Sequence, residues 1–164
     1  MHSSASLFKV LLTFPLSKLY FLAAQRLAEF SNAFFQNVLQ RRADELLASD
    51  IIVIGAPMYN LSIPAVLKAW IDQIVRPMRT FTFSPVYKGL ATGKRAIFAI
   101  AAGGGGYAEG GPRQSDNHAD PYLRKIFSFI GIEDIQFVHF YNTVNDRREQ
   151  GEQLAHQEVH ALTV

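Results

Sequence analysis

The sequence has 164 residues, 49% of them hydrophobic, which suits one domain with a single core. A net charge of +2, with no basic stripe interleaved with aromatic residues, argues against a nucleic-acid partner. Because there is no cysteine, a disulfide framework, a thiolate nucleophile and a cysteine-type zinc site are excluded, and we expect a cytoplasmic location.

The amino-terminal segment is apolar but broken by polar residues. Residues 7–24 are interrupted at three positions, Lys9, Pro15 and Lys18. A membrane-spanning helix needs about 20 mostly apolar residues, and a secretory signal carries its charge ahead of the apolar region, so we expect neither. Alternation within Leu7–Phe14 fits a short strand. Ser17 is placed to cap a long helical segment that ends near Ala48.

The run Ile51–Gly55 predicts a strand of a parallel sheet. Four consecutive β-branched residues followed by Gly-Ala-Pro fit a strand that is buried on both faces. A helix is expected next, over Pro64–Val75, because proline is tolerated in the first turn of a helix.

Two further strands come later in the chain, with a helix between them. The strands are expected at 95–101 and 135–141, and the helix at Tyr122–Ile130, where Gly131 ends it. Polar residues in the last strand, Gln136 and His139, place that strand near an edge. Alternating strands and helices of this kind are typical of an open parallel α/β sheet with right-handed crossovers.

The connections complete a single domain over 1–164. Residues 76–94 form a long connection with a turn at Lys88–Gly89, and connections of this length are usually functional or flexible. Residues 1–20 are atypical for such a domain, and 143–164 form a polar tail that is either helical or frayed.

Two loops at the carboxyl ends of consecutive strands are the candidate cofactor site. The first loop consists of Pro57, Met58, Tyr59, Asn60 and Leu61, and the second of Ala101, Ala102, Gly103 and Gly104. Parallel strands place both loops at one edge, where open sheets bind ligands. Glycine lets the backbone approach a flat ligand, and exposed N–H groups can bind heterocycle acceptors. The alternative is a pair of ordinary turns, with Asn60 as a turn former.

Polar residues elsewhere have simpler interpretations, and we assign no catalytic residue and no metal ligand. His156 and His160 lie four apart but lack the glutamate of an HExxH pattern, so exposed tail histidines are favoured over a metal site. Three loop residues are favoured as solvated rather than as the lining of a substrate pocket: Asp116, His118 and Asp120. His139 is expected to be structural, and Asp72 to lie on a helix surface.

A family resemblance begins in the first loop and extends into the next helix. Ala56-Pro57-Met58-Tyr59-Asn60, then Ile63-Pro64, Leu67-Lys68 and Asp72, resembles the FMN-dependent NAD(P)H:quinone oxidoreductases of the azoreductase type. The resemblance spans about Ala43 to Tyr141. It continues through Gly89-Leu90, Thr92-Gly93-Lys94, Gly103-Gly104, Pro121-Tyr122-Leu123 and Phe129-Ile130-Gly131-Ile132.

The resemblance implies a flavodoxin-like fold, a homodimer, and FMN bound at the subunit interface. It further implies a ping-pong reaction, in which NAD(P)H gives a hydride to the flavin and a quinone or azo compound then takes the electrons. By the same resemblance, Met58–Leu61 lie along the isoalloxazine ring and Ala101–Gly104 face its pyrimidine side. Candidate dimer contacts are Phe34, Phe35, Trp70 and residues 76–88.

Two departures from the family pattern keep other functions open. Ala101 and Ala102 replace a usual Ser-Arg pair, and the amino-terminal strand with its phosphate loop is not evident, so the fold is expected to be shortened there. Weak phosphate contacts are left at Thr13, Ser17 and Lys18. The alternatives are a non-catalytic shortened paralogue that binds flavin weakly, and a flavin reductase or electron carrier.

Overall fold

The computed structural model describes residues 25–29 and 41–162. The chain divides into two compact units, Met1–Leu39 and Gln40–Val164. Residues 25–29, the described part of the first unit, are helical. Some predictions lie outside the described residues: the strand at 7–14, most of the helix from Ser17, the phosphate contacts, and Phe34 and Phe35. One domain over 1–164 stays a prediction.

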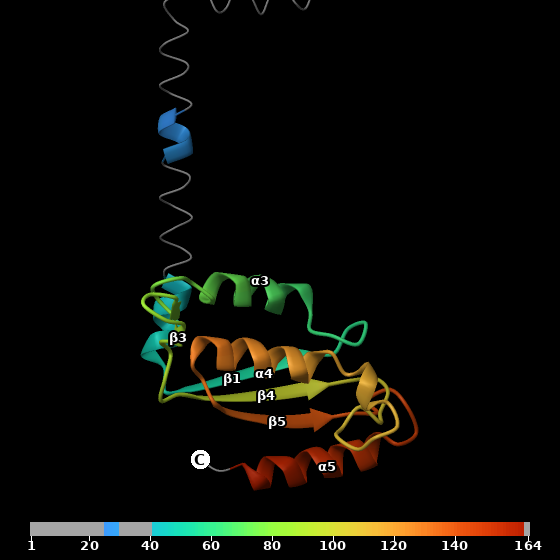
Figure 1. Cartoon of the computed structure of the whole chain (residues 1–164). Coiled ribbons are helices and arrows are strands. Elements are labelled where there is room, and N and C mark those ends of the chain that lie inside the picture. The colour runs from blue at the N-terminus through green and yellow to red at the C-terminus, as the bar shows by residue number, and fades with distance from the viewer. Residues whose placement is uncertain (1–24, 30–40, 163–164) are drawn as a thin grey trace, which may run out of the picture. The chain divides into compact units, whose positions relative to one another are not determined.

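The second unit is built on a parallel sheet of three strands (Figure 1). These are β1 (Ile51–Pro57), β4 (Arg95–Ala101) and β5 (Asp134–Phe140), in the order β1-β4-β5. Both pairs are parallel, and Pro57, Ala101 and Phe140 share one row at the carboxyl ends. The predicted strands, their parallel pairing and the edge position of the third strand are confirmed.

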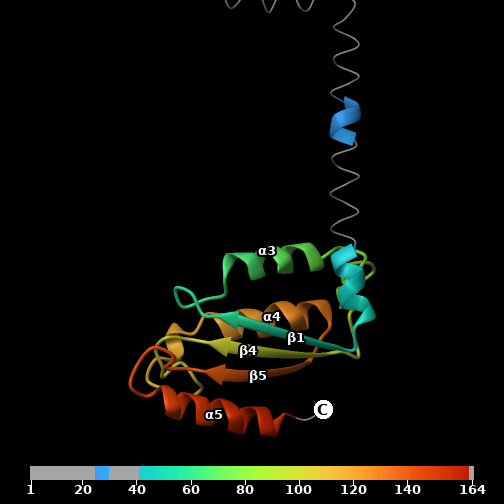
Figure 2. The same ribbon diagram turned by 180° about the vertical axis from the view of Figure 1, so that it is seen from behind.

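Helices flank this sheet unequally (Figures 1 and 2). A helix over 41–48 precedes β1. Next come α3 (Ala65–Ile74) and α4 (Ala119–Ile130), which pack on one face, while α5 (Arg148–Ala161) lies beside β5. The tail thus contains a helix rather than a frayed segment. No helix among the described residues is both long and apolar enough to cross a membrane.

Helix α4 begins three residues earlier than predicted, at Ala119 rather than Tyr122. The cause is Asn117, whose Oδ1 accepts hydrogen bonds from the N–H groups of Ala119 and Asp120, both at 3.1 Å. Such side-chain acceptors satisfy the first free N–H groups of a helix. The helix ends as predicted at Gly131, whose φ of 102° suits glycine.

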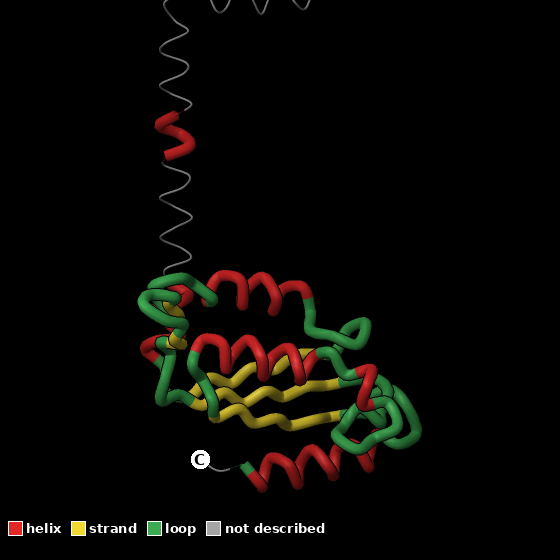
Figure 3. The backbone as a smooth tube through the Cα atoms, in the orientation of Figure 1, coloured by secondary structure: helices red, strands yellow, loops and turns green. Residues whose placement is uncertain are grey.

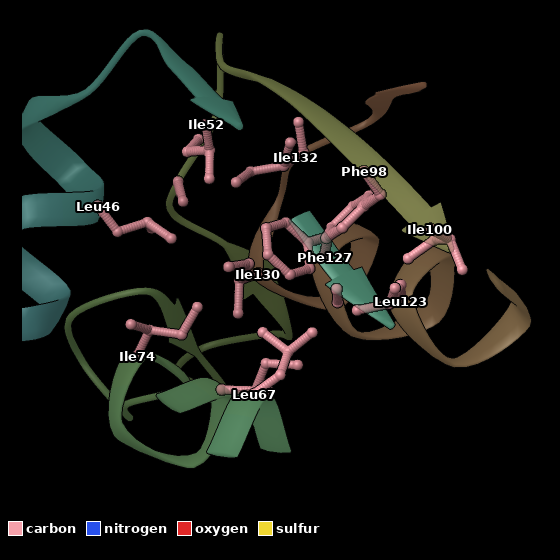
Figure 4. Close-up of a cluster of buried hydrophobic side chains, with 14 residues drawn as sticks. Leu46, Ile52, Leu67, Ile74, Phe98, Ile100, Leu123, Phe127, Ile130 and Ile132 are labelled. Carbon is pink, nitrogen blue, oxygen red and sulfur yellow. The ribbon is translucent and has the colours of Figure 1, made fainter. Parts of the chain in front are cut away.

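The core lies between the sheet and the α3–α4 layer (Figure 4). Phe98 of β4 meets Phe127 of α4 edge to face, with ring centroids 4.9 Å apart. The prediction that the first strand is buried on both faces is wrong for the described part of the chain, since Val53 is 69% exposed. Helices α3 and α4 cover only the face that carries Ile52 and Ala56, and no described element covers the other face of β1.

The long connection after α3 holds a small sheet of its own (Figure 3). Strand β2 (Phe81–Thr82) pairs antiparallel with β3 (Lys88–Gly89), so the predicted turn at Lys88–Gly89 is wrong. Gly89 packs directly against the backbone of Gly131, and a Cβ there would clash with it. This contact of two glycines fixes the connection against the end of α4.

Candidate functional site

The first and second loops meet at the carboxyl edge of the sheet. Pro57 pairs with Ala101 in the parallel register, and the Met58 N–H donates to the Ala101 carbonyl at 2.7 Å. The structure therefore brings together the two loops selected from the sequence.

The first loop is a tight turn with a left-handed backbone. Tyr59 and Ser62 exchange two backbone hydrogen bonds, of 2.9 and 3.1 Å. Between them, Asn60 has φ 49° and Leu61 has φ 68°. Two consecutive left-handed residues define the turn that closes tight hairpins, and asparagine tolerates this region well. Asn60 is thus a turn former, and the turn leaves the Tyr59 side chain 62% exposed.

The second loop is held by a third loop, residues 141–145, which comes directly after β5. Thr143 donates to the Ala102 carbonyl through its N–H at 3.1 Å and through Oγ1 at 3.2 Å. The Asn142 N–H donates to the Gly104 carbonyl at 3.0 Å. These bonds turn the carbonyl groups of the second loop toward the third.

The N–H groups of the second loop consequently face the opposite way. In a planar trans peptide, the C=O of one residue and the N–H of the next point in opposite directions. Since the Ala102 and Gly104 carbonyl groups face the third loop, the N–H groups of Gly103 and Gly105 face away from it. No described residue accepts a hydrogen bond from either. These two donors at the sheet edge can bind the acceptor edge of a flat heterocycle.

Buried aromatic residues support the second loop from below. Tyr107 and Tyr141 pack edge to face at 5.6 Å beneath Ala102, and Met58 and Leu61 pack against this group. The guanidinium of Arg113 lies 4.5 Å from the centre of the Tyr107 ring. Neither the two tyrosines nor the third loop was predicted from the sequence. The rule that chose the first two loops could have found the third, because β5 ends at the same edge.

A cluster of three polar residues lies beside this edge, where His139 of β5 contacts one residue of α4 and one of α5. His139 Nε2 is 2.8 Å from Asp120 Oδ2 on α4, and the His139 N–H donates to Glu158 Oε2 on α5 at 2.5 Å. The placement of Asp120 among solvated loop residues is therefore wrong, because α4 starts early and carries it inward. Asp116 instead pairs with Arg113 at 3.0 Å, and His118 is exposed.

Charge and burial act against each other in this group. Burial favours the neutral imidazole, but the hydrogen bond and charge of Asp120, with the charge of Glu158, outweigh it and raise the pKa of His139. Burial, with the negative charges of Asp120 and Glu158, also raises the pKa of the Tyr141 hydroxyl well above its usual value. The predicted structural role of His139 agrees with these contacts.

An open cavity of about 610 Å³ adjoins the first loop. It is lined by Tyr59, Asn60, Ser62, Ile63, Pro64, Ala65, Lys68 and Tyr122. Lys68 on its wall pairs with Asp72 at 2.5 Å, and both side chains are exposed on α3, as predicted for Asp72. A cavity of about 580 Å³ lies at the opposite end of the strands, between Asp50 and Asp134, and it has no link to the loops.

The remaining sequence candidates do not join the site. His156 and His160 are exposed on α5. Within residues 25–29 and 41–162, no group of three or more histidine, aspartate or glutamate side chains is arranged so that it could hold a metal ion.

Comparison with known proteins agrees with this geometry. A family model described as having a flavodoxin-like fold matches residues 13–162. The chain belongs to this flavodoxin-like family. Similar proteins carry FMN in their names. An FMN-dependent NADH:quinone oxidoreductase 2 of Pseudomonas putida is 50% identical over 97 residues, which are 58% of this chain and 46% of that protein.

One more relative and one solved structure cover a larger share of this flavodoxin-like chain. An FMN-dependent NADH:quinone oxidoreductase 2 of Pseudomonas fluorescens is 43% identical over 130 residues, covering 76% of this chain and 63% of its own. The crystal structure of an FMN-dependent NADH-azoreductase from Bacillus anthracis, in complex with FMN, is 27% identical. It superposes with a TM-score of 0.68 over 76% of this chain and 60% of that chain. The chain thus spans about half to two thirds of the length of these relatives.

Proposed function

We propose that this chain is an FMN-dependent oxidoreductase that passes electrons from NAD(P)H to quinones or azo compounds. The observation that carries the proposal is the pair of outward-facing N–H groups, Gly103 and Gly105, beside the strained turn at Asn60–Leu61. Relatives at up to 50% identity are named as FMN-dependent quinone oxidoreductases. Their names supply the cofactor, the donor and the quinone acceptor of the proposal, and the FMN-dependent NADH-azoreductase from Bacillus anthracis supplies the azo acceptor.

The described residues fit the ring of FMN. The two N–H donors match acceptor atoms on a pyrimidine edge, and glycine at positions 103–105 lets this backbone pack closely against Val144, Tyr107 and Asn142. The exposed Tyr59 ring supplies apolar contact alongside. The residues expected to contact the phosphate, Thr13, Ser17 and Lys18, lie outside the described part of the chain.

In this proposal the protein binds and orients, and it needs no acid or base of its own at the loops. When bound, FMN would supply the chemistry of hydride and electron transfer between NAD(P)H and the acceptor. The N–H groups of Gly103 and Gly105 stabilise negative charge at the pyrimidine edge, because fixed dipoles cost no reorganisation during the reaction. The cavity beside Tyr59 and Tyr122 offers an aromatic wall to a flat acceptor.

We also propose a homodimer in the cytoplasm. The connection after α3 exposes several apolar side chains: Met78, Phe83, Val86 and Tyr87. Exposed apolar patches of this kind mark interaction sites.

The rival function, a non-catalytic relative that binds flavin weakly, is favoured by Ala101 and Ala102, which remove two side-chain donors. A flavin reductase or electron carrier would keep FMN but change the acceptor.

Parallel titrations with FMN and riboflavin test the proposal. We expect the fluorescence of both flavins to be quenched when they bind the protein, with riboflavin binding nearly as tightly as FMN, because the two loops supply the described contacts. FMN binding a hundredfold tighter, a gap of about 2.7 kcal/mol, would reveal a phosphate site, with residues 13–18 the first to test. Binding of neither ligand would favour the non-catalytic relative.

Turnover then separates the two flavin-binding functions. NADH and NADPH oxidation is measured with benzoquinone, with an azo dye and with free flavin as acceptor. Oxidation that depends on the quinone or the dye supports the proposal, whereas oxidation with free flavin alone assigns the chain as a flavin reductase.

A further inference from the structure

We propose that Asn142 is a positioning residue for the flavin site, acting through the second loop rather than by touching the reacting atoms. This inference rests on the proposed function, because it assigns a role toward the bound flavin ring. Its physical basis is the set of contacts that the third loop makes with residues 102–105.

The backbone of Asn142 determines where the second loop turns. Asn142 has φ 63°, a left-handed conformation that asparagine adopts more readily than other side-chain-bearing residues. In this conformation its N–H reaches the Gly104 carbonyl at 3.0 Å, while the next residue, Thr143, reaches Ala102. One left-handed residue thus aligns two donors with two carbonyl groups of the second loop.

The side chain of Asn142 completes the arrangement. Its Oδ1 accepts a hydrogen bond from Asn145 Nδ2 at 3.1 Å, which ties the third loop to itself. The same amide lies so close to Gly105 that a Cβ on Gly105 would come within 2.5 Å of Oδ1. The amide therefore forms a wall against which the Gly105 backbone rests.

The third loop is in turn anchored at its far end. The Arg147 N–H donates to Asn145 Oδ1 at 2.9 Å, and Gly151 of α5 packs directly against the Tyr141 carbonyl, where a Cβ would clash. Asn142 therefore stands between a helix docked on β5 and the donors of the second loop. A rigid support of this kind is required if fixed dipoles are to stabilise charge.

The positions of the second-loop N–H groups matter more in this chain, because residues 101–104 carry no side-chain donor. With alanine at 101 and 102, the donors that the second loop offers to the pyrimidine edge are its backbone N–H groups. The direction of those groups is set by where their neighbouring carbonyl groups are held. Loss of Asn142 should then weaken the preference for reduced over oxidised flavin, and not only the binding of flavin.

Four variants of the full chain test this role. Asn142→Ala removes both the amide and the tolerance of positive φ, Asn142→Gly keeps the conformation alone, and Asn142→Asp keeps the conformation and an acceptor. Asp146→Ala, at an exposed position just past the third loop, is the control. FMN and riboflavin affinities, the two-electron reduction potential of the bound flavin and the melting temperature are measured for each.

We expect Asn142→Ala to bind both flavins about tenfold more weakly and to lower the potential by about 30 mV, which is a tenfold change for two electrons. Asn142→Asp should also lower the potential, because its carboxylate brings a negative charge close to the pyrimidine edge, and Asp146→Ala should leave the potential unchanged. If Asn142→Ala does not fold, Asn142→Gly decides, with a shift in the same direction expected.

Two outcomes overturn the inference in distinguishable ways. A lower melting temperature with an unchanged potential in a folded Asn142 variant would leave a merely structural residue, and the proposed function would stand. Failure of the unchanged chain to bind flavin would overturn the proposed function together with this role.

Discussion

Three of the four non-glycine residues with positive φ in the described part of the chain lie in loops at the carboxyl edge of the sheet. They are Asn60 and Leu61 in the first loop and Asn142 in the third. A left-handed backbone costs a residue with a side chain roughly 1–2 kcal/mol, and such strain gathers at functional sites. At the scale of single residues, the edge chosen for the cofactor therefore carries most of the left-handed side-chain-bearing residues that the structure describes.

Asn60 offers a direct test of the strained turn. We expect Asn60→Val to lower the free energy of unfolding by about 1–2 kcal/mol, because a β-branched residue fits φ 49° poorly. Asn60→Gly should keep the stability of the unchanged chain, since glycine adopts positive φ freely. Urea unfolding followed by circular dichroism measures both. Equal loss in the two variants would contradict a turn-forming role.

The same pair of variants tests whether Asn60 also contacts the cofactor. If the amide binds flavin, Asn60→Gly should weaken flavin affinity while its stability stays unchanged. Equal affinities in Asn60→Gly and the unchanged chain would restrict Asn60 to forming the turn.

At the scale of elements, much of the sheet could be predicted because its signals are local. Consecutive β-branched residues predicted β1, and Gly131 predicted the end of α4. The start of α4 could not be predicted, because it depends on how the Asn117 side chain points. That error placed Asp120 in solvent and hid its contact with His139, which lies 19 residues further along the chain.

The candidate site, too, could be predicted from the sequence only where its features depend on neighbouring residues. Strand order selected the first two loops, since parallel strands end at one edge. The outward direction of the Gly103 and Gly105 N–H groups depends on hydrogen bonds from Asn142 and Thr143, about 40 residues away. No pattern within the second loop carries that information.

The free energy of unfolding should depend on pH through His139, whose contacts link β5 to α4 and α5. Its pKa is raised in the folded chain, so its contacts with Asp120 and Glu158 contribute fully below the unfolded value, about 6.5. That contribution is lost as pH rises through the folded pKa. Hydrogen bonds to charged groups contribute about 1.5–3 kcal/mol, so His139→Gln should lose about this much at pH 5.5 and less at pH 8.5.

Urea unfolding of His139→Gln and of the unchanged chain at the two pH values measures this difference. His156→Gln, at an exposed position on α5, is the control and should lose nothing at either pH. A loss that is equal at pH 5.5 and 8.5 would mean that the imidazole contributes by packing and not by charge.

At the scale of the whole molecule, the second unit holds the carboxyl edge of the sheet in a flavodoxin-like fold and an apolar surface that no described element covers. The surface consists of Met78, Phe83, Val86 and Tyr87 around β2 and β3. Phe83 packs against Phe81, and Tyr87 packs against Phe129, with ring centroids 5.3 and 5.1 Å apart. Aromatic side chains held by such contacts lose less freedom when they bind a matching patch on a second copy.

The homodimer prediction is tested by changing that patch. We expect the unchanged chain to scatter light as a dimer at micromolar concentration, and Phe83→Ser with Val86→Ser to shift it toward monomer, because two exposed apolar anchors are lost while the core beneath stays intact. Val159→Ser, which alters an exposed valine on α5, should leave the dimer unchanged. A monomer in the unchanged chain would refute the dimer. A dimer that survives the double substitution would place its interface elsewhere, and Trp70 on α3 is then the next candidate.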